Sequence, residues 1–255
     1  MVIPKSKWKL FLSEATGVAI LLFFGLSIVI FNWGEGSIVA RKFPSPLFRT
    51  ALTGFMFGSV GCLVTLSPVG RISGAHINPV VSIAFWLRGK MSFNTTIGYI
   101  LGQMTGAVAG CLPLLLWGNM GKSIQYAITL PGSRGVLMAF LGEVFVTGSL
   151  ILYLYIFIGS KKLRNLTPYG IPFLYCILNL LEAPLSGDST NPARSFGPAV
   201  ISGNFDYYWL YWLAPLTGTV IVTLIFRIRR LRRVYRMDKA RVSYHNRPSP
   251  EEHQF

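Results

Sequence analysis

The sequence of 255 residues has few charged residues, and acidic residues are the scarcest of these. Asp and Glu number 9 against 24 Lys and Arg, and charged residues of both signs make up 13% of the chain, roughly half the share in an ordinary soluble domain. Hydrophobic residues make up 52%, and the mean hydropathy is +0.50. So little charge excludes a soluble globular protein, and the length fits one polytopic membrane domain.

Cysteine is also scarce, since Cys62, Cys111 and Cys176 are the only three. Each lies in an apolar segment, and their spacing matches no metal site or disulfide framework. The sequence likewise contains no Gly-x-Ser-x-Gly, no His-Glu-x-x-His, no P-loop and no cluster of metal ligands. We therefore expect no enzymatic activity, no metal and no cofactor.

The surplus of basic residues gives a net charge of +15, which raises the question of a nucleic-acid partner. Nine of the Lys and Arg residues fall within 227–247, directly after the last apolar run. No RNA- or DNA-binding motif accompanies them, so we expect no nucleic-acid partner. A basic segment after a membrane helix is instead typical of the cytoplasmic side, where anionic lipid headgroups are its neighbours.

Several apolar runs are long enough to cross a bilayer as helices. They cover about 10–31, 48–66, 95–117, 136–158, 169–185 and 208–226. Two shorter helix-like stretches, 78–87 and 191–201, each begin with Asn-Pro. Short, proline-interrupted segments at matching positions of two halves are typical of an inverted repeat with its site near the midplane. We therefore predict an all-α membrane protein with six transmembrane helices and two re-entrant half-helices.

The predicted channel domain covers residues 1–233, with a first repeat at about 10–117 and a second at about 136–226. Residues 234–255 are polar, and we expect a mobile cytoplasmic tail there. Six crossings put both termini on one side, and this side collects 18 of the Lys and Arg residues against 6 on the other. The bias predicts cytoplasmic termini in a plasma or inner membrane, although it falls to 9 against 6 without the tail.

Asn78-Pro79 and Asn191-Pro192 are two helix starts within the apolar region. Asn is a favoured N-cap and Pro is favoured at the next position. Irregular backbone at membrane depth is tolerated only where protein buries it or where it lines a water-filled cavity. Half-helices that enter from opposite faces bring two positive dipole ends and two Asn amides to one constriction. Such a pore favours neutral molecules over cations and protons.

Charged residues inside the apolar segments need partners there. Glu14 and Glu143 lie near the start of corresponding runs in the two halves. We expect each to face the interior and to accept hydrogen bonds from backbone or loop groups. Arg194 follows Asn191 by three residues, one turn into the second half-helix. It is either a cation barrier at the outer mouth or a structural residue that holds loop carbonyl groups.

Two strings carry a family resemblance: Ser-Gly-Ala-His-Ile-Asn-Pro-Val at 73–80 and Asn-Pro-Ala-Arg-Ser-Phe-Gly-Pro-Ala at 191–199. They resemble the signature sequences of the aquaporins, also called the major intrinsic proteins, and the resemblance extends from Glu14 to about Phe226. It implies a pore in each protomer, a homotetramer, and Arg194 in an outer filter of aromatic and arginine residues. The constriction that the resemblance implies is formed by Asn78, Pro79, Val80, Asn191, Pro192 and Ala193.

Positions that separate water channels from glycerol facilitators in this family favour water. Facilitators usually have Asp after the second Asn-Pro-Ala-Arg, where this chain has Ser195. Ala199, Tyr211 and Trp212 also match the water-channel pattern. We therefore predict a passive water channel that excludes ions and protons. A channel for glycerol or other small neutral solutes is the alternative, and a proton-coupled carrier that uses acidic groups near the second loop is a remote one.

The sequence departs from the family pattern at the constriction and at the filter. Val80 replaces the customary Ala, and it either narrows the pore or packs elsewhere. Asn179 stands at the filter position where strict water channels have His. Asp188, three residues before the second Asn-Pro, is unusual as well. Its carboxylate either turns away to cap loop N–H groups or lies beside Arg194.

One filter position is ambiguous, and one histidine invites a pH-sensing role. Counting back from Asn78 gives Gly58 as the filter residue, but one extra residue near Pro68 would make it Phe57. Glycine would widen the mouth, whereas an aromatic ring would narrow it. His76 lies two residues before the first Asn-Pro, and we expect it to stabilise the loop. Glu182, before the second loop, has the same expected role.

Overall fold

The computed structural model describes residues 7–228, and that part of the chain contains helices and no β-strand. The first half has the long helices α1 (Trp8–Trp33), α3 (Pro46–Leu66) and α6 (Phe93–Cys111) and the short helix α5 (Pro79–Leu87). The second half repeats this order with α8 (Gly135–Gly159), α9 (Thr167–Ser186), α10 (Pro192–Ser202) and α11 (Leu210–Ile225). The short connecting elements are α2 (Ile38–Lys42), α4 (Pro68–Ser73), η1 (Leu112–Trp117), α7 (Gly118–Lys122), η2 (Gln125–Ala127) and η3 (Arg164–Leu166).

The fold is the predicted one, with six long helices and two half-helices. The third apolar run departs from its expected bounds, because its α-helix ends at Cys111 and continues as the 3₁₀ helix η1. Pro113 is the physical reason, since proline donates no N–H and clashes with the preceding turn of an α-helix. The expected polar tail at 234–255 lies outside the described residues.

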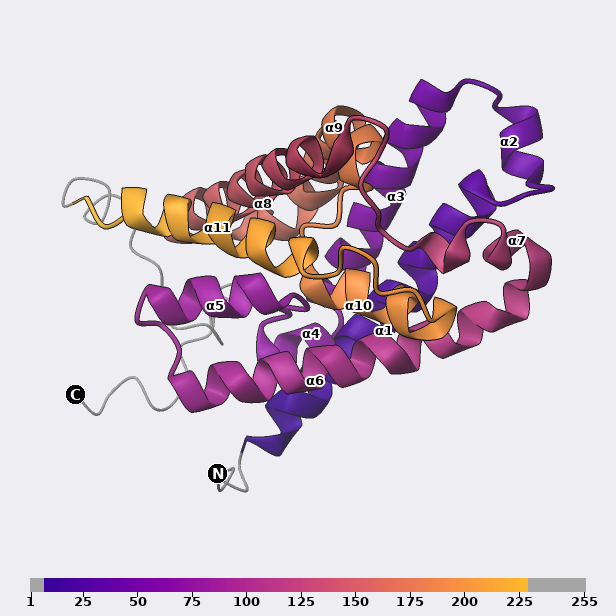
Figure 1. The fold of residues 1–255 in the computed structure, drawn as a ribbon. Coiled ribbons are helices and arrows are strands. Elements are labelled where there is room, and N and C mark those ends of the chain that lie inside the picture. The colour runs from indigo at the N-terminus through magenta and orange to yellow at the C-terminus, as the bar shows by residue number, and fades with distance from the viewer. Residues whose placement is uncertain (1–6, 229–255) are drawn as a thin grey trace.

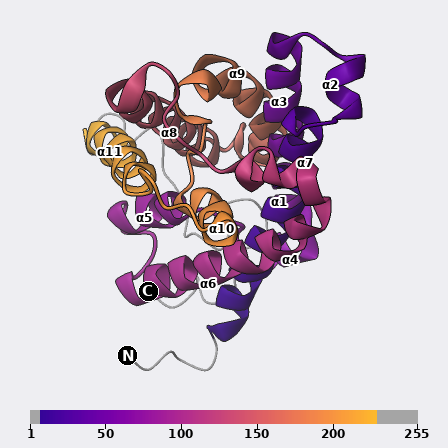
Figure 2. The same cartoon turned by 45° about the vertical axis from the view of Figure 1, so that its right-hand side comes forward.

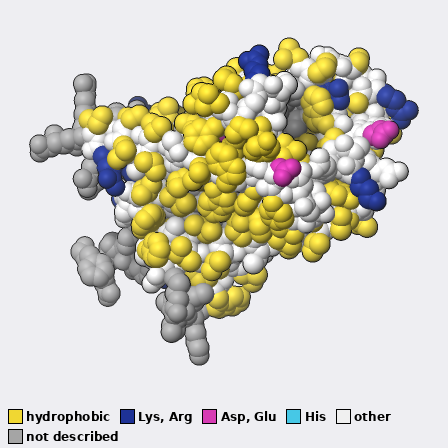
Figure 3. All heavy atoms as spheres, viewed as in Figure 1, with side chains coloured by type: hydrophobic (Ala, Val, Ile, Leu, Met, Phe, Trp, Pro, Cys, Tyr) yellow, Lys and Arg dark blue, Asp and Glu magenta, His cyan; other side chains and the backbone are white. Residues whose placement is uncertain are grey.

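Within the described residues, four helical segments are long and apolar enough to cross a membrane. They are Trp8–Trp33, Pro46–Leu66, Phe93–Lys122 and Gly135–Gly159. The remaining two long helices complete the bundle through packing, because α9 lies against α3 and α8, and α11 lies against α8. Figure 3 shows hydrophobic side chains over the middle of one face of the molecule, with Lys and Arg side chains toward its left and right ends and at its upper edge.

The two halves pack in corresponding ways. In the first half α1 contacts α3 and α6, and in the second half α8 contacts α9 and α11. Each half-helix also crosses over to the other half, since α5 contacts α11 and α10 contacts α6. Figure 1 shows α5 and α10 in one line between α6 and α11, and the turned view in Figure 2 keeps them adjacent. This is the arrangement of an inverted repeat.

A stripe of small residues brings α1 and α6 into close contact. Glycines recur at every fourth position of α6, at 98, 102, 106 and 110. A β-carbon on Gly102 would lie 2.5 Å from the carbonyl oxygen of Phe11, and one on Gly110 would lie 2.6 Å from the Cα of Ala19. Small residues spaced by four let the backbones of membrane helices approach in this way.

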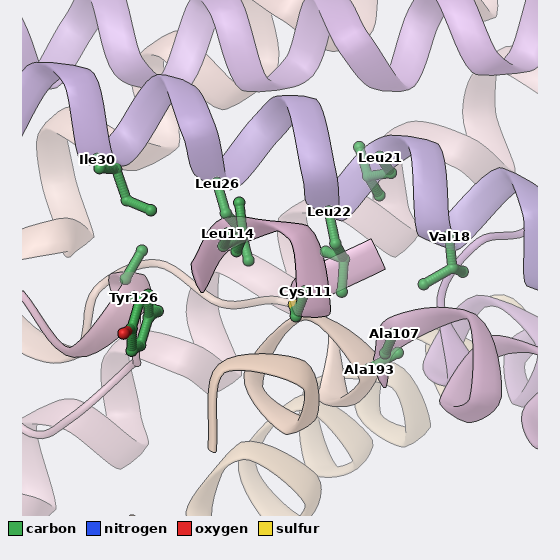
Figure 4. Close-up of a cluster of buried hydrophobic side chains, with 11 residues drawn as sticks. Val18, Leu21, Leu22, Leu26, Ile30, Ala107, Cys111, Leu114, Tyr126 and Ala193 are labelled. Atoms are coloured by element: carbon green, nitrogen blue, oxygen red, sulfur yellow. The ribbon is translucent and has the colours of Figure 1, made fainter. Parts of the chain in front are cut away.

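The hydrophobic core of the first half lies between α1, α6 and the start of α10. Figure 4 shows the row of α1 side chains from Val18 to Ile30 facing Ala107, Cys111 and Leu114. Ala193, in the first turn of α10, belongs to the same buried cluster. The core of the first half therefore holds the tip of the second half-helix in place.

Candidate functional site

The loops that precede α5 and α10 share one unusual backbone conformation. Before Asn78, the φ angles of Gly74, Ala75 and Ile77 are positive, at 89°, 49° and 43°. The same offsets before Asn191 repeat the pattern, with Gly187 at 90°, Asp188 at 49° and Thr190 at 52°. Left-handed backbone costs a non-glycine residue about 1–3 kcal/mol. Each loop therefore needs support from outside itself.

Glu14 supplies this support in the first half. Its carboxylate is fully buried. Oε1 accepts a hydrogen bond from the backbone N–H of His76 at 3.0 Å, and Oε2 accepts one from that of Ile77 at 2.7 Å. Oε2 also accepts a bond from Nε2 of Gln103 at 2.7 Å. The helix α1 thus holds the first loop through one buried side chain.

Glu143 has the same place in the second half. Its Oε1 accepts hydrogen bonds from the backbone N–H of Ser189 at 2.7 Å and from the hydroxyl of Ser186 at 2.6 Å. Its Oε2 accepts one from the N–H of Thr190 at 2.9 Å. Glu182 adds a second carboxylate here, since its Oε2 accepts from the N–H of Asp188 at 2.7 Å. The second loop is therefore held by two acidic side chains.

The two Asn-Pro pairs meet where α5 and α10 begin. Asn78 caps α5 by accepting from the N–H of Val80 at 3.0 Å, and Asn191 caps α10 by accepting from the N–H of Ala193 at 3.0 Å. Each amide also donates across to the opposite loop, Asn78 to the carbonyl oxygen of Thr190 and Asn191 to that of Ile77, both at 2.9 Å. An amide nitrogen carries two hydrogens, so one remains on each Asn.

A narrow cavity of about 70 Å³ reaches this meeting point, and we call it the Asn78 cavity. Asn78, Asn191 and His76 are among the residues that line it. Val80 is fully buried and is absent from this lining, where Val81 appears instead. The branched side chain of Val80 therefore packs away from the cavity and does not narrow it.

His76 is held inside the first loop. Its Nδ1 lies 3.1 Å from the hydroxyl oxygen of Ser82, and its ring packs against Phe85 and Tyr99 with centroids 4.5 and 5.1 Å away. Only 2% of the residue is exposed. These contacts join the loop to α5 and α6.

A second and larger cavity of about 490 Å³ lies on the other side of the Asn pair, and we call it the Arg194 cavity. Arg194, Asn179, Asp188 and Phe57 all line it. Nη1 of Arg194 donates to the carbonyl oxygen of Ala127 at 2.7 Å. Nδ2 of Asn179 donates to the carbonyl oxygen of Thr50 at 2.6 Å. The structure thus brings proposed filter residues from α3, α9, α10 and the loop before α10 to one cavity.

The carboxylate of Asp188 does not have the capping role that the sequence offered as one of two possibilities. The neighbouring loop N–H groups are already bound by Glu143 and Glu182. Oδ1 of Asp188 is buried and has no hydrogen-bond partner among the described residues. Asp188 and Arg194 line the same cavity.

The geometry also decides between Phe57 and Gly58 as the candidate for the filter position. A β-carbon on Gly58 would lie 2.8 Å from the Cα of Pro172, so this glycine serves the contact between α3 and α9. Phe57 lines both the Arg194 cavity and the Asn78 cavity, whereas Gly58 lines only the Asn78 cavity. Phe57 is therefore the better candidate for the filter, as the alternative with one extra residue required.

Two residues of the site were not singled out from the sequence. Ala127 contributes the carbonyl group that binds Arg194, from the short element η2, whose segment has no periodic pattern that would predict its position. Tyr175, on α9, lines both cavities. Its position one turn before Asn179 was the available signal, because residues four apart share a helix face.

Comparisons with known proteins agree with this architecture. The family model described as Major intrinsic protein matches residues 2–226. The chain is 32% identical over 224 residues to the probable aquaporin TIP2-2 of Arabidopsis thaliana, with 86% of each chain covered. It is 30% identical over 229 residues to aquaporin-2 of Bos taurus, with 84% of this chain and 76% of the relative covered. The X-ray structure of the aquaglyceroporin from Plasmodium falciparum shares the fold, with a TM-score of 0.73 at 21% identity over 89% of this chain and 98% of that one.

Proposed function

Because the chain belongs to the major intrinsic protein family of membrane channels, we propose that it conducts water passively and excludes ions and protons. The observation that carries this proposal is the pair of Asn side chains at the facing ends of α5 and α10, both of which line the Asn78 cavity. Passive diffusion through such a pore requires no chemical reaction and no cofactor.

The mechanism follows from the donors that remain at the meeting point. A water molecule there accepts hydrogen bonds through its oxygen from the second amide hydrogens of Asn78 and Asn191. With its lone pairs engaged, it cannot accept a proton from the next water in the file. The N-terminal ends of the two half-helices add positive potential at the same point, which disfavours cations and hydronium.

Arg194 gives the outer cavity a second barrier against cations. Its guanidinium is always charged, only 6% of the residue is exposed, and its Nη1 is fixed on Ala127. The remaining N–H groups are donors that a passing water or carbonyl oxygen accepts. The sign of the charge and the geometry of the donors both favour neutral, hydrogen-bonding molecules.

A channel for glycerol or another small neutral solute is the alternative. The size of the Arg194 cavity, about 490 Å³, and the amide of Asn179 at the position of the usual histidine favour it. Ser195, at the position where facilitators usually have Asp, favours water. A proton-coupled carrier is the remote candidate, because buried oxygens of Glu182 and Asp188 have no partner among the described residues.

Stopped-flow light scattering on proteoliposomes of the purified protein tests these candidates. The proposal expects water permeability well above that of empty vesicles, with an activation energy close to that of water diffusion, and little response to glycerol or urea gradients. Permeability no higher than that of empty vesicles would refute it. A steep temperature dependence with saturation would favour the carrier instead.

We further propose a homotetramer in a plasma or inner membrane, with both termini cytoplasmic, on the resemblance to this family and on the basic residues. The basic residues from position 229 onward lie outside the described part of the chain. They are proposed to contact anionic lipid headgroups, and no nucleic-acid partner is proposed. Cross-linking in native membranes measures the number of subunits.

A further inference from the structure

The two cavities of the proposed pore share a boundary made by two aromatic rings. Among the described residues that line the Asn78 cavity and the Arg194 cavity, only Phe57 and Tyr175 line both. Their ring centroids are 6.3 Å apart, and the ring planes are inclined by 40°. The passage between the cavities therefore runs past these rings, on α3 and α9.

Both rings are fixed in place by their neighbours. A β-carbon on Gly25 of α1 would lie 2.6 Å from the ring of Phe57, so the glycine makes room for a ring that packs against the α1 backbone. The hydroxyl of Tyr175 lies 2.8 Å from Oγ1 of Thr190, whose backbone N–H is in turn bound by Glu143. Neither ring can swing aside without disturbing a buried contact.

The outer residues leave more room than these rings do. Asn179 is tied back to Thr50 and Arg194 is tied to Ala127, and the cavity between them measures about 490 Å³ against about 70 Å³ beyond the rings. The aromatic pair presents carbon faces, and the tyrosine hydroxyl is engaged with Thr190. A solute that is wider than water and needs lateral hydrogen-bond partners loses both space and partners here.

We propose that Tyr175 pairs with Phe57, a residue of the proposed filter, to form a constriction between the Arg194 cavity and the Asn pair, and that this ring pair sets the largest solute that the channel passes. This inference rests on the proposed function as a pore. It assigns size selection to Tyr175, one helical turn before Asn179 on α9. It also explains how a channel with Asn179 in place of the usual filter histidine can select for water.

The test compares variants of the full chain in proteoliposomes under water and glycerol gradients. Tyr175→Ala removes the ring, and its glycerol permeability is expected to rise about tenfold or more, since a steric discrimination of this kind is commonly 10- to 200-fold. Tyr175→Phe keeps the ring and loses the hydroxyl, so it should exclude glycerol like the wild type. Tyr169→Ala is the matched control, because this tyrosine of the same helix is 55% exposed; its permeabilities should equal those of the wild type.

Tyr175→Leu also removes the ring but leaves an apolar side chain in its place, and it is expected to raise glycerol permeability too, so the test stands even if Tyr175→Ala does not fold. Glycerol permeability at the wild-type value in the folded variants that lack the ring would overturn the inference. A different result would refute the proposed function, namely that vesicles with the wild-type protein conduct water no faster than empty vesicles.

Discussion

Arg194 and Asp188 both line the Arg194 cavity, and they differ in how their side chains are held. The arginine is anchored on a carbonyl group, while Oδ1 of the aspartate has no partner among the described residues. In Arg194→Ala the fixed positive charge is lost from the wall of this cavity, so cations are no longer repelled there. A unit charge at about 4 Å is worth about 1–4 kcal/mol in a partly wet site, so we expect proton or cation leak to rise about tenfold or more. Fluorescent pH and potassium assays on proteoliposomes measure it.

Arg134→Ala is the control for this prediction. Arg134 is exposed just before α8, and its removal changes the net charge by the same amount without altering the cavity. A leak that rises equally in both variants would point to surface charge rather than to the position of Arg194. A leak unchanged in Arg194→Ala would remove this residue from the proposed cation barrier.

The hydrogen bonds of Glu143 to the second loop are expected to contribute to the stability of the folded protein. Its two carboxylate oxygens accept three hydrogen bonds, and Glu143→Gln replaces one acceptor oxygen with an amide donor that faces an N–H or hydroxyl donor. A buried donor left without a partner costs about 1–3 kcal/mol, so the variant should unfold at a lower temperature. Thermal unfolding in detergent, followed by tryptophan fluorescence, measures this. Glu35→Gln, at an exposed carboxylate, should unfold with the wild type.

For single residues, the sequence predicts which side chains belong to the candidate site, but it does not predict the orientation of each side chain. Residue type and spacing predict Asn78 and Asn191 as helix starts at a constriction, whereas they leave Arg194 either as a cation barrier or as a structural residue. The choice between Phe57 and Gly58 depends on a one-residue offset that only the packing of α3 against α9 resolves. The direction of the Asp188 side chain depends on which carboxylates accept the hydrogen bonds of the loop N–H groups. Glu182 accepts from the N–H of Asp188 and Glu143 from that of Ser189, so these groups are not available to Asp188.

The contact between α1 and α6 is so close that the addition of one methyl group at a glycine disturbs it. In Gly106→Ala the added methyl would overlap the backbone carbonyl of Ala15, so the helices must separate. Overpacking of a tight contact costs about 1–3 kcal/mol, and a lower unfolding temperature is expected. Gly148→Ala is the matched control in α8, where the nearest atom to the new carbon is 3.7 Å away. Equal unfolding temperatures for the two variants would contradict this close contact.

Elements were predictable where one physical cause dominates. The half-helices α5 and α10 begin within one residue of their expected starts, because an Asn cap and a Pro at the next position fix a helix start regardless of context. The segment between α7 and α8 had no such signal. Its backbone is irregular, with positive φ at Gln125, Tyr126 and Ala127, and the buried contacts of Tyr126 and the bond from Arg194 to Ala127 position it.

At the scale of the whole molecule, the distribution of basic residues predicts the direction in which the chain crosses the membrane. The positive-inside rule places the loop after α8, with Lys161 and Lys162, on the cytoplasmic side and the loop before α8 outside. Ser133 and Lys162 are exposed beyond the two ends of α8. A cysteine at each position therefore reports one face of the membrane, and the two sites lie at opposite ends of one helix.

A membrane-impermeant maleimide added to intact cells should label Ser133→Cys directly and Lys162→Cys only after permeabilisation. The unsubstituted protein is the control, because Cys62 and Cys111 are buried and Cys176 is half-buried on α9. The reverse pattern would place both termini outside, and the Arg194 cavity would then open toward the cytoplasm. The cation barrier would still act, but on the inner side, since a fixed charge in a pore repels cations from whichever side they come.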